Sequence, residues 1–275
     1  MKPAPFDLFR PRSVDRVLAL LQAHGDDAKV LAGGQSLVPL MNFRLAQPRH
    51  LIDLNGVPGM DQIQFNDHTL SLGAMVRQRD VERSPAIAER LPILREAIEQ
   101  VGHPAIRNRG TVGGSIVHAD PSAELPLLSI ALDATVHLRS AKANRSVAAR
   151  DFYQGYLLTD IAPDELLVGI DFRLPPADCG WCCSEIARRH GDFAIVAVAA
   201  LADGADGIRL GVAGMAERPA VRRVPSEGAG LQDAIERLAW ELEGYEDIHA
   251  SAHMRRDLLR RIAPLVVREA MQCAA

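Results

Sequence analysis

The sequence has few aromatic residues and no excess of basic charge. The lack of basic charge argues against nucleic acid as a partner. Aromatic residues make up 4% of the 275 residues, and 31 Lys and Arg stand against 35 Asp and Glu, for a net charge of −4. Proteins that hold nucleic acid through its phosphates have a basic excess. We therefore expect no nucleic-acid partner.

Long apolar runs and spread-out cysteines are also absent. The longest apolar run covers residues 193–202, about half of the roughly 20 residues that cross a bilayer. Three of the four cysteines, Cys179, Cys182 and Cys183, lie together, and Cys273 lies near the end. This spacing is not a disulfide framework and fits a reducing compartment. We expect no membrane span and a cytoplasmic protein.

Common catalytic motifs are missing as well. The chain has no G-x-G-x-x-G, no G-x-x-x-x-G-K-S/T, no G-x-S-x-G and no H-E-x-x-H, so hydrolytic catalysis and the usual nucleotide-binding motifs have no support. The Cys179-x-x-Cys182-Cys183 cluster has three readings: a metal site, a redox dithiol or inert thiols. A tetrahedral thiolate site needs four ligands, and only distant Cys273 supplies a fourth cysteine. We predict no catalytic residue and no metal site.

The pattern of apolar residues predicts a mixed fold. Hydrophobic residues are 48% of the chain, enough for a conventional core. A capped helix after Ser13, short strands at 29–32 and 51–54 and a helix at 36–43 form a βαβ pattern typical of a parallel sheet. A hairpin follows at 63–72, with turn residues Asn66 and Asp67. We expect an Arg- and Gly-rich loop over residues 102–115.

Further strands are expected near 134–138, 145–148 and 166–172. Pro175 and Pro176 cannot continue a central strand or a helix, so the boundary between two domains is placed there. Beyond it, strands near 193–202, 208–212 and 221 predict a small antiparallel sheet. Two helices close the chain, and Pro264 should kink or split the last one.

Two glycine pairs carry the first candidate site. Ala32-Gly33-Gly34-Gln35-Ser36 lies between a predicted strand and helix, and we call it the first glycine turn. Glycines let a backbone approach an anion closely, and turn N–H groups and a helix N-terminus attract one. The Ser36 hydroxyl donates a hydrogen bond or caps the helix. An ordinary tight turn is the alternative.

The second pair follows two arginines. Thr111-Val112-Gly113-Gly114-Ser115, the second glycine turn, comes directly after Arg107-Asn108-Arg109-Gly110. Two such turns in one domain suit a ligand with two phosphates. The alternative is a plain turn beside solvated arginines.

A third motif, His118-Ala119-Asp120-Pro121-Ser122-Ala123-Glu124, places two acidic residues where they can accept hydrogen bonds from ribose hydroxyls or orient a loop. A helix-capping turn is the alternative. A metal at His118 and Asp120 lacks a third ligand.

Taken in this order, the three motifs resemble the FAD-binding medium subunit of molybdenum hydroxylases, the family of carbon monoxide dehydrogenase and the split-chain relatives of xanthine dehydrogenase. The segment from Arg188 to Ala194 and the closing helix after Ser251 resemble that family's C-terminal domain. The resemblance implies an α+β fold. An FAD-binding domain of the vanillyl-alcohol-oxidase (PCMH) type, with two αβ subdomains, would occupy residues 1–174. A small antiparallel sheet and helices would occupy residues 177–275.

The same resemblance implies the residues that contact FAD. Both glycine turns match the family's cofactor-binding segments and would hold the pyrophosphate. Glu124 matches an acidic contact position and Leu167 an apolar one near the flavin. Some members place a lysine just ahead of the Arg-Arg segment, where this chain has Ser184.

The implied function is electron transfer within a heterotrimer, arranged as a dimer of heterotrimers. A large molybdopterin-binding subunit oxidises the substrate, and a small iron–sulfur subunit passes electrons to the FAD of this chain and on to an external acceptor. The substrate and the acceptor stay open. The alternatives are a self-contained FAD-dependent oxidase of the same fold family and a scaffold without flavin.

Overall fold

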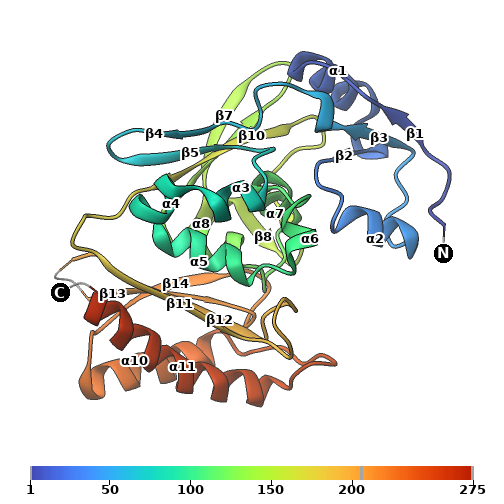
Figure 1. Cartoon of the computed structure of the whole chain (residues 1–275). Coiled ribbons are helices and arrows are strands. Elements are labelled where there is room, and N and C mark those ends of the chain that lie inside the picture. The colour runs from blue at the N-terminus through green and yellow to red at the C-terminus, as the bar shows by residue number, and fades with distance from the viewer. Residues whose placement is uncertain (1, 205–206, 274–275) are drawn as a thin grey trace.

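Over the described residues the chain forms three larger sheets, which follow one another along the sequence, and one two-stranded hairpin, with helices between the larger sheets and below the last (Figure 1). The coordinates are a computed structural model that describes residues 2–204 and 207–273. Within these ranges, none of the helices has both the length and the apolar character that crossing a bilayer requires.

The N-terminal sheet is parallel, as the sequence predicts. Its strand order is β1-β3-β2, from β1 (Asp7–Phe9), β3 (His50–Asp53) and β2 (Ala28–Leu31). Two helices flank it, α1 (Val14–His24) and α2 (Leu37–Asn42). Ser13 caps α1, because its Oγ accepts a hydrogen bond from the Arg16 N–H at 3.3 Å. The sequence analysis missed β1, whose three residues are largely exposed and carry no apolar pattern.

The middle sheet is antiparallel and is built around β10, which pairs with β5 on one side and β6 on the other. Its order is β4 (Ile63–Phe65), β5 (Thr69–Gly73), β10 (Leu166–Arg173), β6 (Thr135–Arg139) and β7 (Asn144–Ala148). The expected hairpin at 63–72 is confirmed. Asn66 shapes its turn, since its Oδ1 accepts hydrogen bonds from the His68 and Thr69 N–H groups, both at 2.8 Å.

Short helices cover this sheet and lie between it and the C-terminal sheet (Figure 1). They are α3 (Gln78–Arg83), α4 (Pro85–Arg90), α5 (Pro92–Gln100), α6 (Pro104–Arg107), α7 (Val112–His118), α8 (Glu124–Ala131) and α9 (Ala149–Phe152). A small hairpin, β8 (Tyr153–Gly155) and β9 (Leu158–Thr159), follows α9.

The expected loop over residues 102–115 is wrong, because α6 and the start of α7 lie within it. Pro104 takes the first position of α6, where a proline costs no hydrogen bond. Thr111 caps α7, since its Oγ1 accepts a hydrogen bond from the Gly114 N–H at 3.0 Å. Because this short helix contains two glycines, its apolar residues do not show a helical spacing in the sequence.

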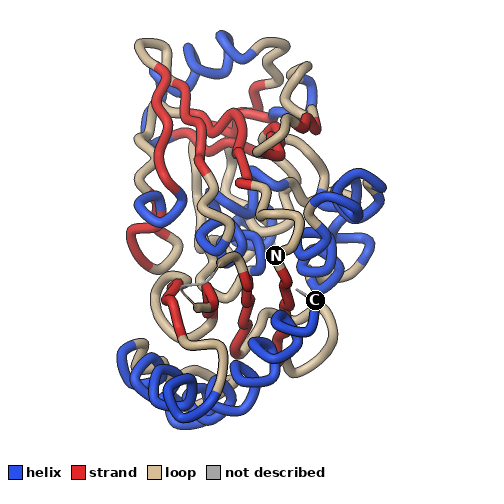
Figure 2. Tube along the Cα trace, turned by 90° about the vertical axis from the view of Figure 1, so that its left-hand side faces the viewer, coloured by secondary structure: helices blue, strands red, loops and turns tan. Residues whose placement is uncertain are grey.

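The C-terminal sheet is antiparallel and lies on two long helices (Figure 2). Its strands run in chain order as β11 (Gly180–Ile186), β12 (Val196–Ala202), β13 (Ile208–Ala213) and β14 (Ala220–Val224), and the helices are α10 (Gly228–Glu241) and α11 (Ala252–Cys273).

Both faces of this sheet are buried, which is why β12 reads as an unbroken apolar run. Val196 and Val198 pack on the core that includes α10 and α11. Ala197 and Ala199 face the other way and join the larger core of the first 174 residues. Gly211 of β13 also faces this core, and a Cβ there would lie 3.0 Å from Leu127 of α8. Small residues thus let the sheet come close to α8.

Pro264 does not split the last helix, contrary to expectation, since α11 continues through it to Cys273. A proline inside a helix costs about 3 kcal/mol. The residues on either side of it, Ile262, Ala263, Val266 and Val267, are buried against the sheet, and this packing holds the helix together.

Arg255 of α11 ties four segments of the C-terminal half together. Its side chain is 1% exposed. It donates hydrogen bonds to the backbone oxygens of Ile195 (2.6 Å), Gly214 (2.8 Å) and Tyr245 (3.1 Å), and to Asp247 (2.7 Å). The Gly214 N–H in turn donates to the Pro121 carbonyl at 2.9 Å. The loop after α7 is therefore anchored to α11.

We expect Arg255→Met to destabilise the fold by about 3–5 kcal/mol, because it leaves Asp247 and buried carbonyl groups without their partner. The free energy of unfolding in urea measures the effect. Arg261→Met, at an exposed arginine of the same helix, is the control and should change stability by less than about 0.5 kcal/mol. Equal effects of the two substitutions would contradict a central role for Arg255.

Candidate functional site

The first glycine turn leaves its backbone donors free. It follows β2 and leads into α2, with Gly34 at a φ of +75° that favours glycine. Within the described part of the chain, the N–H groups of Gly34, Gln35 and Ser36 donate to no protein acceptor. Ser36 precedes α2 without a capping hydrogen bond from its side chain. Three amides and one hydroxyl are thus available to a ligand.

The second glycine turn differs, because its amides are already used. The Val112 N–H donates to the Val76 carbonyl and the Gly113 N–H to the Ala74 carbonyl, both at 2.9 Å. The Gly114 N–H donates to the Thr111 side chain. These amides of the second turn are therefore hydrogen-bonded within the chain, and the turn is braced against the segment that follows β5.

The two turns lie against each other. A Cβ placed on Gly33 would lie 2.9 Å from the Gly110 Cα and closer still to the Arg109 carbonyl oxygen. A Cβ placed on Gly114 would lie 3.7 Å from the Ala32 Cβ. Backbone meets backbone at Gly33, and no side chain fits between. Segments almost 80 residues apart in the sequence therefore form one structure.

Two polar side chains that the sequence analysis missed connect the same segments. The Asn55 amide donates to the Ala32 carbonyl at 3.1 Å and accepts a hydrogen bond from Arg77 at 2.6 Å. Arg77 also donates to the Arg109 carbonyl. Burial, and then the nearby Arg109 charge, lower the pKa of Arg77. The only sequence signal was the position of Asn55, just after the end of a parallel strand, where binding residues gather.

Arg107 is not a solvated arginine of the second turn. It is 5% exposed, and its guanidinium donates to Glu82 at 2.8 Å and to the Val101 and Gly102 carbonyls at 3.0 and 3.1 Å. The hydrogen bonds from Arg107 lower the pKa of Glu82. Arg107 thus closes the end of α5 and fixes the entry to the second turn. Arg109 is exposed.

The third motif is a turn that joins α7 to α8. Ala119 ends α7 with a φ of +55°, and the Asp120 carboxylate accepts a hydrogen bond from the Ser122 N–H at 2.8 Å. Burial lowers the pKa of His118 and raises that of Asp120. The Asp120 side chain thus shapes the turn itself, whereas α8 begins after Ala123 with no side-chain cap.

Glu124 opens α8 and is buried. Burial, with a contribution from the charge of Glu185, raises the pKa of Glu124 to about 8. Burial raises the pKa of Glu185 to about 7. Glu185 lies on β11. With its raised pKa, Glu124 is mostly protonated near neutral pH.

Leu167 lies close to the second glycine turn. It is buried in β10 at an irregularity of the pairing with β6. The next residue, Val168, accepts a hydrogen bond from the Ala74 N–H at 3.1 Å, and the Ala74 carbonyl accepts the Gly113 N–H. Leu167 is therefore separated from the turn by one backbone segment.

The cysteine cluster has the properties of inert thiols. The Cys182 thiol donates to Glu269 at 3.0 Å. Burial raises the pKa of Cys179 to about 11 and of Cys182 to about 12, and raises that of Cys183 as well. Metals and disulfide exchange require the thiolate, which these environments disfavour. Over the described residues, no three His, Cys, Asp or Glu side chains are arranged to hold a metal ion.

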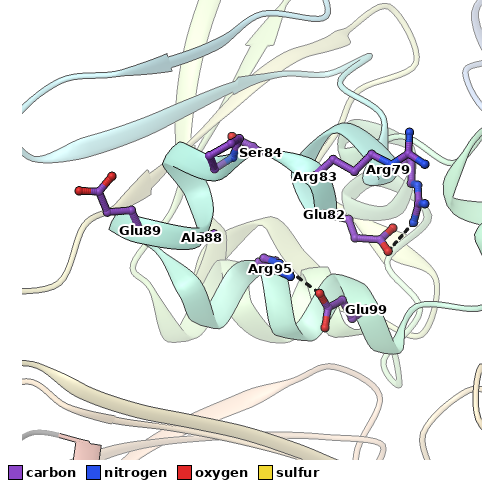
Figure 3. A pocket seen from close by; sticks show the side chains of 9 residues that line it. Arg79, Glu82, Arg83, Ser84, Ala88, Glu89, Arg95 and Glu99 are labelled. Carbon is purple, nitrogen blue, oxygen red and sulfur yellow. Dashed lines mark hydrogen bonds and ion pairs between the residues drawn. The ribbon is translucent and has the colours of Figure 1, made fainter.

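Two cavities lie away from the glycine turns. One, of about 680 Å³, lies along α3, α4 and α5, where Arg79 points to Glu82 and Arg95 to Glu99 (Figure 3). The other, of about 1080 Å³, lies beside Pro175 and Pro176. No residue of either glycine turn lines them. The junction of the two turns is the candidate site because of its free amides and the close backbone contact at Gly33.

Comparison with known proteins identifies the family of the chain. Residues 4–176 match the family described as the FAD binding domain in molybdopterin dehydrogenase. The chain belongs to this family. The matched residues include both glycine turns, the third motif and Leu167.

Several relatives cover most of the chain. It is 36% identical over 274 residues to the nicotine 6-hydroxylase medium subunit of Paenarthrobacter nicotinovorans, covering 94% of this chain and 95% of that protein. It is 40% identical over 194 residues to the carbon monoxide dehydrogenase medium chain of Hydrogenophaga pseudoflava, covering 70% and 68%.

Solved structures superpose on this chain along its whole length. Carbon monoxide dehydrogenase from Hydrogenophaga pseudoflava superposes with a TM-score of 0.94 at 32% identity, covering 100% of both chains. Quinoline 2-oxidoreductase from Pseudomonas putida 86 superposes with a TM-score of 0.92 at 35% identity, covering 100% of this chain and 99% of that one.

These matches confirm the family, the α+β fold and FAD as the cofactor. They also confirm that the chain is an oxidoreductase component of the molybdopterin-dependent class. The first glycine turn fits such a cofactor on its own chemistry, because free amides beside a glycine at positive φ form an anion-binding concavity. The division at residues 174 and 177 and the contacting residues themselves remain predictions.

We expect Gly33→Ala to weaken FAD binding at least tenfold, because the added methyl group forces the two turns apart. Gly230→Ala is the control, since its Cβ would meet only Pro225, at 3.4 Å. Titration of the purified variants with FAD, followed by flavin fluorescence, measures the dissociation constant. Wild-type affinity in Gly33→Ala would show that the junction does not hold the cofactor.

The raised pKa values of Glu124 and Glu185 predict a stability that falls with rising pH. Both have folded pKa values above the usual 4.5, so the folded state holds more protons than the unfolded state between about pH 4.5 and 8. Their contribution is complete below pH 4.5 and is lost as the pH rises through 7 and 8. Glu124→Gln should remove most of this slope in urea unfolding of the FAD-free chain. An unchanged slope would contradict the raised pKa of Glu124 in the folded chain.

Proposed function

We propose that the chain is the FAD-carrying electron-transfer subunit of a heterotrimeric molybdenum hydroxylase. In this role it receives electrons from the iron–sulfur clusters of a partner subunit and passes them through FAD to an external acceptor. The observation that carries the proposal is the contact of the two glycine turns, which fits a ligand with two adjacent phosphates. Membership of the FAD-binding family supports it.

In the proposal, the two turns play different parts in holding the diphosphate. The free amides of Gly34, Gln35 and Ser36 and the Ser36 hydroxyl donate hydrogen bonds to its oxygens. The second turn, residues 111–115, supplies a rigid wall, and its Thr111 and Ser115 hydroxyls are the groups left to donate. Asn55 and Arg77 fix the spacing between the turns.

The flavin end of the cofactor is assigned to Glu124 and Leu167. Leu167 offers a buried apolar surface one backbone segment from the second turn. Glu124 lies one helix farther along the chain and is mostly protonated at neutral pH because of its raised pKa. A protonated carboxyl group donates a hydrogen bond, and it does so without placing a charge beside the flavin.

Electron transfer needs positioning and electrostatics from the protein rather than a nucleophile or a metal of its own. FAD accepts electrons one at a time and delivers two, which is the chemistry it supplies when bound. The residues of this chain hold the cofactor and exclude water from its phosphates. Substrate oxidation is assigned to a large molybdopterin-binding subunit, and the clusters to a small iron–sulfur subunit.

The relatives support the partner arrangement. Those described above are named as medium chains or medium subunits, and their names refer to substrates as different as nicotine and carbon monoxide. In the proposal, the choice of substrate is assigned to the partner subunit and not to this chain. A dimer of heterotrimers in the cytoplasm completes the proposal, and the absence of disulfides among the described cysteines is consistent with that compartment.

The proposal predicts that the isolated chain binds FAD but oxidises no organic substrate. A visible spectrum after mixing with FAD at micromolar concentration and gel filtration should show about one bound flavin. Anaerobic addition of a reduced [2Fe–2S] ferredoxin should bleach that flavin. Small alcohols and amines should not. Failure to bind flavin, or steady turnover of an alcohol or amine, would overturn the proposal.

A further inference from the structure

Asp53 lies beside the first glycine turn, at the carboxyl edge of the N-terminal sheet. It is the last residue of β3, and its partner in the parallel pairing with β2 is Leu31, the residue directly ahead of Ala32. Neighbouring strands lie about 4.8 Å apart. Because the carboxyl ends of the two strands meet at one edge of the sheet, Asp53 and the turn share that edge. Ligands of open parallel sheets bind outside this edge.

Asn55 ties the Asp53 side chain to that turn. The Asp53 Oδ1 accepts hydrogen bonds from the Asn55 backbone N–H at 3.0 Å and from the Asn55 side-chain amide at 2.6 Å. The same amide donates to the Ala32 carbonyl at 3.1 Å, and its oxygen accepts a hydrogen bond from Arg77 at 2.6 Å. Both N–H donors of the Asn55 amide are therefore used within the chain. Asn55 orients Asp53 and has no donor left for a ligand.

The second carboxylate oxygen of Asp53 is free. Over the residues that the structure describes, Oδ2 accepts no hydrogen bond, and the cation within ion-pair distance of it is Arg10, whose Nε lies 3.9 Å away. The Arg10 side chain is 71% exposed, so water screens this pair. Asp53 itself is 19% exposed, which holds its orientation and still leaves it within reach of a ligand. Because a carboxylate accepts hydrogen bonds and donates none, its ligand must supply hydroxyl or N–H donors.

The donors that suit this oxygen are the hydroxyl groups of a ribose. An acidic residue after a strand of a parallel sheet binds ribose hydroxyls in other nucleotide sites. The adenosine ribose of FAD is bonded directly to the diphosphate. With the flavin assigned to Glu124 and Leu167, the adenosine half is left for the side of the first turn, where Asp53 lies. The third motif is less suited to the ribose, because Asp120 shapes its own turn by accepting the Ser122 N–H.

We propose that Asp53 binds the 2′- and 3′-hydroxyl groups of the adenosine ribose of FAD and selects a nucleotide with an unmodified ribose. The inference rests on the proposed function, which places the diphosphate at the first glycine turn, and it deepens that function by naming the side chain that recognises the adenosine half. A nucleotide without the 2′-hydroxyl leaves a carboxylate oxygen without its donor. A nucleotide with a 2′-phosphate brings a second negative charge to the carboxylate.

Competition with bound FAD tests the proposal on the purified full chain, with ADP and 2′-deoxy-ADP as the probes and flavin fluorescence as the readout. The unaltered chain should bind ADP about 10- to 100-fold more tightly than 2′-deoxy-ADP, as expected for a hydrogen bond to a charged group. Asp53→Asn should lower this ratio to about two or less, because an N–H₂ group replaces the accepting Oδ2. The remaining amide oxygen still accepts the Asn55 N–H, so the local fold is kept.

Asp27→Asn is the matched control, because Asp27 lies at the opposite edge of the same sheet. It directly precedes β2 and pairs with Arg49 at 3.8 Å. This substitution removes the same charge from the sheet without touching the carboxyl edge. The Asp27→Asn chain should therefore keep the ratio of ADP to 2′-deoxy-ADP affinity that the unaltered chain has.

The ratio of the two affinities separates a ribose contact from a structural role. If Asp53→Asn weakened ADP and 2′-deoxy-ADP equally, Asp53 would only hold the loop after β3, and the inference would be overturned. Tighter binding of 2′-phospho-ADP than of ADP would assign this edge to Arg10 and would overturn it too. An unaltered chain that binds FAD but does not distinguish ADP from 2′-deoxy-ADP would overturn the inference and leave the proposed function intact. A chain that binds no FAD would overturn both.

Discussion

The fold depends on one close approach, that of the Gly33 backbone to the backbone of Arg109 and Gly110. No side chain fits at this point, since even a methyl group would lie 2.9 Å from the Gly110 Cα. The contact joins the turn that follows β2 of the parallel sheet to the segment between α6 and α7. Every other feature of the site serves to hold this contact or to use it.

The hydrogen bonds around the two glycine turns hold the second turn rigid and leave the first turn with free N–H donors. Arg107 closes the end of α5, Thr111 caps α7, and the amides of Val112 and Gly113 are bonded to the loop after β5. Asn55 and Arg77 then span the two turns. With the amides of the second turn bonded within the chain, the unbonded amides of the first turn are the donors that we propose for an anion. A cofactor phosphate bound there completes hydrogen bonds that the chain itself leaves unmade.

Much of the fold and of the candidate site could be predicted from the sequence, and the predictions that failed did so for physical reasons. The βαβ pattern, the Asn66 hairpin and the glycine turns follow from local rules, and the order of the motifs indicated the family. The helix α7 was missed because two glycines interrupt its apolar pattern. Pro264 was expected to kink or split the last helix, and α11 is not split, because its packing against a sheet does not show in the local sequence. Asn55 and Arg77 are single polar residues far apart in the sequence, and only the tertiary structure brings them together. The asymmetry between the turns depends on hydrogen bonds from Val112 and Gly113 to Val76 and Ala74, which no local pattern shows.

We propose that the junction of the two glycine turns binds the diphosphate of FAD. A crystal structure of the chain with FAD bound tests this most directly. We expect the phosphate oxygens within hydrogen-bond distance of the Gly34, Gln35 and Ser36 amides, with residues 111–115 closing the other side. A diphosphate bound elsewhere on the chain, with the contact between Gly33 and Gly110 left bare, would contradict the central claim.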